Sequence, residues 1–312
     1  MKTTITKLPE QQSRRRLNPL NDYLFCKVMG EKGSEVQLLG FLNAVLGRSE
    51  KDKIVSIDII ENKTLSAETI GDKSSILDVR AVLQGGTRLN IEVQLRNFWN
   101  LDRRSLFYWS KEFTKSLKSG QDYCELPATI AINIINFNYL ETENFHTVFH
   151  LREEKEPSLI LTDALEIHFL NMVKWRKLGN KDIKNEPLHR WLTWFDKSSP
   201  AEQVEEVISM DLAIFEAEKR QAYLSGDEDL IRAYDMREMA ISDQISRENY
   251  AYDKGFAEGE VTGEVKGEAK GEAKRNLEIA QNSLAEGLPI KTIQKITGLD
   301  LDTIKQLTDS KN

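Results

Sequence analysis

Two consecutive runs of alternating apolar and polar residues meet at the glycine pair Gly85-Gly86. The first run is SILDVRAV at residues 75–82, and the second is LNIEVQL at residues 89–95. A period of two is typical of β-strands with one buried face, and a glycine pair between two such runs indicates the turn of a β-hairpin. The two strands are therefore predicted to pair antiparallel.

Each predicted strand carries one acidic residue, Asp78 in the first and Glu92 in the second. In a hairpin that turns at the glycine pair, the two carboxylates lie roughly opposite each other, and Gln94 shares the face of Glu92. A buried pair of carboxylates is costly unless a cation neutralises it, and Mg²⁺ is a hard cation that prefers oxygen ligands. A bound metal would polarise a phosphoryl oxygen and activate a coordinated water. This face therefore predicts a metal-dependent phosphodiesterase.

The spacing alone leaves a second interpretation open. Asp78 and Glu92 would then be solvent-facing residues of an amphipathic hairpin, with Arg80 and Arg88 as their salt-bridge partners. An acid in each strand of a hairpin is a weak motif, so the choice depends on the rest of the sequence.

Four segments, taken in order, strengthen the catalytic interpretation. They are NPLNDYLFCK at 18–27, ILDVR at 76–80, NIEVQ at 90–94 and RRSLFYW at 103–109. This series resembles the recombination-promoting nuclease (Rpn)/transposase family of the PD-(D/E)XK nuclease superfamily. The resemblance covers roughly residues 15–140 and continues more loosely to about residue 255. It implies a DNA endonuclease that is linked to recombination and depends on Mg²⁺, with Mn²⁺ as a substitute.

Carried over by position, Asp78 matches the superfamily's metal-binding aspartate and Glu92 matches its second acid. Gln94 stands where many members have a lysine, whose full charge would stabilise the attacking hydroxide or the phosphate; glutamine offers only an amide dipole. Glutamine at this place is also what the resembling transposase-like group tends to show. We therefore predict Asp78, Glu92 and Gln94 as catalytic residues. The alternative is a catalytically inactive DNA-binding or self-assembly protein that retains the nuclease fold.

Other charged residues are candidates for accessory roles. Arg104, Tyr108, Lys111 and Lys115 follow at helical spacing, and they would either contact phosphates and replace the missing positive charge or form a solvated helix face. Asp22 opens the first predicted helix, where its carboxylate is either an N-terminal cap or a third acidic ligand.

The order of the predicted elements indicates a mixed α/β (α+β) fold with a restriction-endonuclease-like core, αβββαβ, over residues 15–195. An apolar helical stripe covers residues 38–46, a strand covers 54–60 before the hairpin, and a helix covers 100–119. The almost continuous apolar run at 128–137 is typical of a strand that is buried on both faces. Further strands are expected within 145–175, including 159–161 and 165–170, and a packed aromatic helix is expected at 188–195.

A helical C-terminal extension is predicted beyond this core. Residues 196–252 form a helical cap, and residues 253–275 contain a Gly-Glu tetrapeptide repeat. Glycines four apart give a helix a smooth stripe for close approach of a second copy, whereas the alternative is a charged, flexible linker. Residues 276–312 resemble a small helix-turn-helix tail that would bind DNA or self-associate. We therefore expect a homodimer or higher homo-oligomer through the C-terminal region.

Composition constrains partners and location. The net charge of −7 means that any DNA contact must come from local patches, such as 14–16 and the helix at 103–118. The two cysteines exclude a disulfide scaffold and favour the cytoplasm, and no apolar segment is long enough to span a membrane. His146 and His150 lie four apart but do not fall in a regular helical pattern, so a zinc site there is disfavoured.

Overall fold

The computed structural model describes residues 16–60, 78–97, 100–115, 117, 120 and 122–309. The chain divides into two compact units, Met1–Ser242 and Asp243–Asn312. The second unit begins within a long helix. This division is coarser than the four segments predicted from the sequence, and those boundaries stay a prediction.

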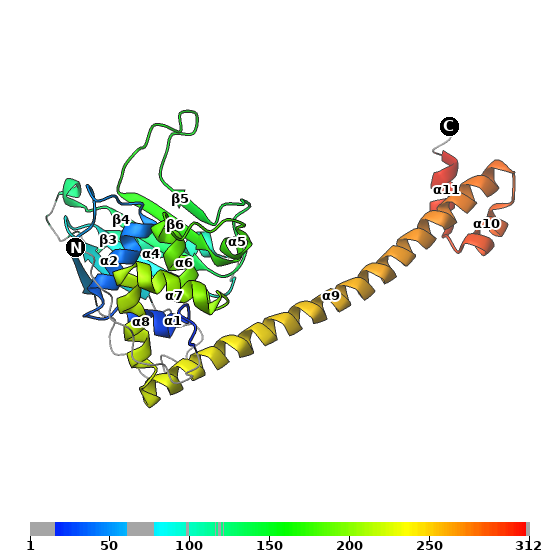
Figure 1. Ribbon diagram of the computed structural model, residues 1–312. Coiled ribbons are helices and arrows are strands. Elements are labelled where there is room, and N and C mark those ends of the chain that lie inside the picture. Colours follow the sequence, from blue (N-terminus) through cyan, green and yellow to red (C-terminus); the bar gives the residue numbers. More distant parts are fainter. Residues whose placement is uncertain are drawn as a thin grey trace. The chain divides into compact units, whose positions relative to one another are not determined.

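A mixed sheet forms the centre of the first unit (Figure 1). In the described part of the chain its order is β1-β2-β3-β4-β6-β5. The first three strands pair antiparallel, β4 and β6 run parallel to β3, and β5 is antiparallel to β6. The strands are β1 (Ile57–Ile60), β2 (Asp78–Leu83), β3 (Arg88–Gln94), β4 (Thr129–Ile135), β5 (His146–Phe149) and β6 (Leu165–Asn171). The sheet and its helices confirm the predicted mixed α/β fold class.

The predicted hairpin is formed by β2 and β3. Its loop contains Gly85 and Gly86 with φ angles of 90° and 88°, values that residues with a Cβ rarely adopt. The amide of Gly86 donates to the carbonyl of Leu83 at 3.0 Å. This turn sets the register, in which Asp78 lies directly opposite Glu92. The glycine pair therefore determines which acids face each other.

Helices cover both faces of the sheet. On one face the main core is formed by α1 (Asp22–Met29), α2 (Glu35–Val45), α6 (Pro187–Phe195), α7 (Ala201–Met210) and α8 (Leu212–Leu224) (Figure 1). On the other face α4 (Leu101–Thr114) packs on β3 and β4. Two short elements are η1 (Tyr123–Glu125) and α5 (Met172–Lys177). The apolar alternation of β2 and β3 thus turns Val79 and Ile91 toward the main core and leaves their polar residues on the side of α4.

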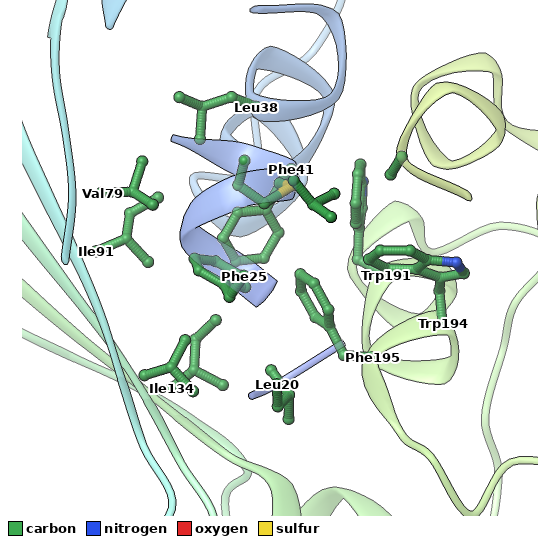
Figure 2. Close-up of a cluster of buried hydrophobic side chains, with 14 of the residues drawn as sticks. Leu20, Phe25, Leu38, Phe41, Val79, Ile91, Ile134, Trp191, Trp194 and Phe195 are labelled. Carbon is green, nitrogen blue, oxygen red and sulfur yellow. The ribbon is translucent and has the colours of Figure 1, made fainter. Parts of the chain in front are cut away.

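Aromatic side chains fill the space between the sheet and the outer helices. Figure 2 shows Phe41 of α2 between the strand residues and the tryptophans of α6. Its ring centroid lies 5.6 Å from Trp191 and 5.2 Å from Phe195, both in edge-on geometry. Trp191, Trp194 and Phe195 are almost completely buried. The interpretation of this aromatic helix as core is confirmed.

The contact between α2 and α8 depends on a glycine. A Cβ placed on Gly40 would lie 2.3 Å from the Cβ of Ala213, which is closer than carbon atoms can approach. We expect Gly40→Ala to lower the free energy of unfolding by about 1–3 kcal/mol, because the two helices must move apart. Urea unfolding measures the loss. Adding Ala213→Gly should recover part of it, and a double variant no more stable than the single one would contradict this packing.

Two segments of the first unit differ from the sequence prediction. The helix predicted at 100–119 ends at Thr114, and residues 159–161 form no strand; Ile160 makes only an isolated antiparallel bridge with Arg152. In contrast, β4 is buried along its whole length, as its apolar run predicts.

The second unit contains the end of α9 (Glu228–Ala285), α10 (Ile290–Thr297) and α11 (Leu301–Asp309). The glycine repeat lies inside α9 and is helical and exposed throughout. Ala280, Ile293 and Ile304 form a small core, and Gly298 ends α10 with a φ of 68°. The small tail predicted for residues 276–312 thus consists of the last part of α9, α10 and α11. Among the described residues, no helix combines the length and the apolar character needed to cross a bilayer.

Candidate active site

The two predicted acids face each other across the hairpin on the side of the sheet that α4 covers. Asp78 is the first residue of β2, and Glu92 is its register partner in β3. On its other side Glu92 pairs in register with Asn133 of β4. The Oδ1 atom of Asn133 accepts a hydrogen bond of 3.0 Å from Ser105 of α4. The acids are thereby fixed in a row of polar side chains beneath α4.

Glu92 is a deeply buried carboxylate, with 2% of its surface exposed. Its Oε1 accepts a hydrogen bond of 2.6 Å from Nη2 of Arg104. Burial nevertheless raises the pKa of Glu92, because loss of solvation outweighs the attraction of Arg104. The site therefore holds a negative charge that one arginine does not fully compensate.

Asp78 is half-buried, with 23% of its side chain exposed. Burial raises the pKa of Asp78, and the charge of Arg80, whose Nε lies 3.6 Å from Oδ2, only partly opposes the shift. Asp78 and Glu92 are register partners, and both have raised pKa values. Such a pair of acids favours the binding of a cation. Arg88 pairs with Glu112 of α4 at 3.2 Å, so only Arg80 is placed as the simple salt-bridge interpretation requires.

Gln94 follows Glu92 on the same face of β3, with 5% of its surface exposed. Both polar atoms of its amide are buried and lack a hydrogen-bond partner among the described residues. The amide still favours the ionised form of Glu92 from nearby, although the two groups do not meet in hydrogen-bonding geometry. A buried amide without a partner is costly, so Gln94 is suited to a ligand, a water or an ion that enters the site.

The donor set fits a hard divalent cation. Two carboxylates face each other, and an amide with an unused oxygen lies beside them. Within the described ranges, no three His, Cys, Asp or Glu side chains are grouped to hold a metal. Mg²⁺ usually keeps several waters and takes only one or two carboxylates from a protein, so this set is compatible with Mg²⁺ and is a poor match for a structural zinc.

The accessory residues of α4 divide into two groups. Arg104 contacts Glu92, and the pKa of Tyr108 is raised by burial and by the charges of Glu92 and Asp78, so Tyr108 lies within electrostatic reach of the acids. Lys111, in contrast, lies 6.0 Å from the ring of the exposed Phe107. Lys115 pairs with Glu112. Arg104 and Tyr108 thus face the site, whereas Lys111 faces solvent.

Asp22 has a protein partner far along the chain. Its carboxylate accepts from Nε and Nη2 of Arg237 in α9, at distances of 2.5 to 3.1 Å. The cap of α1 is Asn21, whose side chain accepts from the amide of Leu24, so the prediction that Asp22 is the cap was wrong. The helix begins at Asp22 itself, one residue earlier than that prediction requires. A role of Asp22 as a third metal ligand stays a prediction.

Glu112 is a site-facing residue that sequence reasoning missed. It lies on α4 with 4% of its surface exposed, and its carboxylate is surrounded by Arg80, Arg88 and Lys115. Its position eight residues after Arg104 and four after Tyr108 places it on the same helix face. Extending the helical spacing to acidic residues would have found it.

Of the two histidines predicted to be an unsuitable metal site, His146 lies in a strand and His150 directly follows it. His146 belongs to β5, and its Nε2 lies 2.9 Å from Nδ1 of His168, whose Nε2 contacts Glu166 at 2.6 Å. Burial, followed by the neighbouring His168, lowers the pKa of His146 to about 4. His146 is therefore neutral at pH 7, and its partner is His168 rather than His150.

The partly buried contact between His146 and His168 predicts that the stability of the protein depends on pH. Because the pKa of His146 is lower in the folded than in the unfolded protein, the unfolded state binds more protons between about pH 6.5 and pH 4. The free energy of unfolding should therefore decrease as the pH falls through that range. His146→Gln should flatten the decrease. Urea unfolding at a series of pH values measures it, and identical profiles for the two proteins would refute this coupling.

Comparison with known proteins gave one kind of match, to a family model. Curated protein sequences and solved structures each gave no match to the chain. The family model described as PD-(D/E)XK nuclease family transposase matches residues 19–251, a span that includes both acids, Gln94 and α4. This match confirms the family resemblance of the four motifs. The chain belongs to the PD-(D/E)XK nuclease family transposases.

Proposed function

We propose that this protein is a Mg²⁺-dependent DNA endonuclease that hydrolyses phosphodiester bonds. The observation that supports this most directly is the pair of acids, the half-buried Asp78 and the buried Glu92, which face each other in a chain of a nuclease family. Both have raised pKa values because of burial, so a divalent cation between them would relieve an electrostatic penalty. Asp78 and Glu92 are the proposed metal ligands, with Mn²⁺ as a substitute for Mg²⁺.

The residues around the acids have distinct proposed roles. When bound, the metal supplies Lewis acidity and lowers the pKa of a water. Gln94 orients that water or the phosphate through its buried amide. Arg104, 2.6 Å from Glu92, supplies the full positive charge that glutamine lacks at position 94, and the Tyr108 hydroxyl donates to a phosphate oxygen.

DNA is the proposed substrate despite the net charge of −7. The exposed side of α4 carries Arg103 and Lys111, and phosphate contacts from this helix would align the DNA backbone over the metal. Such contacts are electrostatic, so affinity should fall steeply with salt. A reducing cytoplasm is the proposed setting, and Cys26 and Cys124 are both thiols.

Gln94 also supports a second candidate, a catalytically inactive protein that binds DNA or assembles on it. Incubation of supercoiled plasmid with the full chain separates the two. A nuclease should cut in Mg²⁺ or Mn²⁺ and stop in EDTA, and added Mg²⁺ should restore cutting. Intact plasmid under all conditions, with folded protein and a measurable shift of a DNA fragment, would select the inactive candidate.

Self-association through α9 is proposed for the second unit. Five glycines at spacings of four, from Gly255 to Gly271, cost about 1 kcal/mol each in an isolated helix, and the helix around them is exposed. A second copy packed against the glycine stripe would offset that cost. Gly267→Leu should therefore shift the full chain toward monomer in light scattering, although it favours the helix itself. Ala269→Leu, on another side of the helix, is the matched control. An equal effect of Gly267→Leu and Ala269→Leu would contradict self-association through the glycine stripe.

A further inference from the structure

Beyond the acid pair, an ionic cluster centred on the buried Glu112 connects Asp78 to α4. Arg80 lies between two carboxylates, with Nε 3.6 Å from Oδ2 of Asp78 and Nη1 3.8 Å from Oε1 of Glu112. Glu112 also accepts from Nη2 of Arg88 at 3.2 Å and from Nζ of Lys115. Three cations, from β2, β3 and the end of α4, therefore converge on the carboxylate of Glu112.

The charges in this region are unevenly balanced. The described ion pairs contain three carboxylates, Asp78, Glu92 and Glu112, and four cations, Arg80, Arg88, Arg104 and Lys115. Although burial opposes ionisation, Lys115 and Arg88 hold the pKa of Glu112 below its ordinary value, so Glu112 is charged at pH 7. Without Glu112 the excess of positive charge would double, next to a site that must accept a divalent cation.

Arg80 and a metal ion compete for the same carboxylate. Both are attracted to Asp78, and the ion pairs of Arg80 with Asp78 and with Glu112 are each longer than a hydrogen bond, so the guanidinium is shared between these two acids. If Glu112 lost its charge, the pull of that carboxylate on Arg80 would disappear, and Arg80 would move closer to Asp78 and neutralise more of its charge. Glu112 thus prevents Arg80 from forming a closer ion pair with Asp78.

We propose that Glu112 is a positioning residue for the metal site, which holds Arg80 away from Asp78 so that the Asp78 carboxylate can bind a divalent cation. This role rests on the proposed nuclease function. It explains why an acidic side chain is buried on the helix that otherwise brings positive charge to the phosphate. It also predicts an energetic coupling between Glu112 and Arg80 that can be measured without catalysis.

The test is calorimetric titration of Mn²⁺ and Mg²⁺ into the EDTA-treated, dialysed full chain. Glu112→Gln should weaken binding of the metal by about tenfold or more, because it frees Arg80 to neutralise Asp78 and removes a nearby negative charge. Adding Arg80→Gln to this variant should restore affinity to within a few-fold of the wild type. Arg80→Gln alone should bind at least as tightly as the wild type.

A matched control is Asp196→Asn, which removes a buried carboxylate from an ion pair with Arg176 at 3.0 Å outside this cluster. It should leave metal affinity unchanged. Wild type that binds neither metal would overturn the metal site itself and, with it, this role. Wild type that binds while Glu112→Gln binds equally well would overturn only the role of Glu112. Failure of Arg80→Gln to restore affinity, or equal weakening by Asp196→Asn, would also overturn the coupling.

Discussion

Replacement of Asp78 by asparagine is expected to reduce Mg²⁺-dependent cleavage of DNA by about 10³-fold or more while leaving the fold at least as stable. Asparagine keeps the shape of the side chain but removes the charge that would hold the metal, and loss of one such group in a preorganised site usually costs several powers of ten. The experiment is plasmid cleavage under single-turnover conditions, with unfolding by urea measured on the same preparations.

The expected gain in stability has a definite sign. Burial raises the pKa of Asp78 in the folded protein, so ionisation at pH 7 acts against folding, and a neutral side chain removes that penalty. Asp58→Asn is the matched control, because Asp58 is an exposed acid on β1 of the same sheet. Its cleavage rate should equal that of the wild type. Wild-type cleavage by Asp78→Asn would show that the acid pair is not the site.

The hairpin and its acids could be predicted because their signals are local. Alternation of period two and a glycine pair are contained within twenty residues, and together they fix the register that places Asp78 opposite Glu92. Gln94 follows from the same alternation. The buried strand β4 was likewise visible as a continuous apolar run.

Other features depend on contacts between distant parts of the chain, which periodicity does not show. Arg237 is separated from Asp22 by more than two hundred residues, and nothing near Asp22 indicates a buried arginine partner. From the sequence, the repeat in α9 could be either a helix or a flexible linker, because glycine opposes a helix while its Glu and Lys neighbours favour one. The missed role of Glu112 has a different cause, since an acid on a basic helix face is usually a solvated residue.

The second large effect is expected at the contact between α1 and α9. Asp22 and Arg237 are 8% and 5% exposed, and the guanidinium donates to both carboxylate oxygens. Asp22→Asn leaves the arginine charge buried without its counter-ion, so the free energy of unfolding should fall by about 3–5 kcal/mol. The double variant Asp22→Asn, Arg237→Met should recover part of this loss, because it removes both charges. Urea unfolding of the wild type and the two variants measures both changes.

The same variants decide what Asp22 does. α9 is also attached to α1 by the hydroxyl of Tyr234, which accepts from the amide of Asn18 at 3.0 Å, and by Glu238, which accepts from Asn21 at 2.7 Å. Asp22 is therefore part of a polar contact that fixes the first turns of α9, and its loss should affect stability and not the metal. Titration of Mn²⁺ into folded Asp22→Asn, below its unfolding temperature, should give wild-type affinity. If the affinity instead falls as far as it does in Asp78→Asn, then Asp22 is a third ligand, and Arg237 must release it when the metal binds.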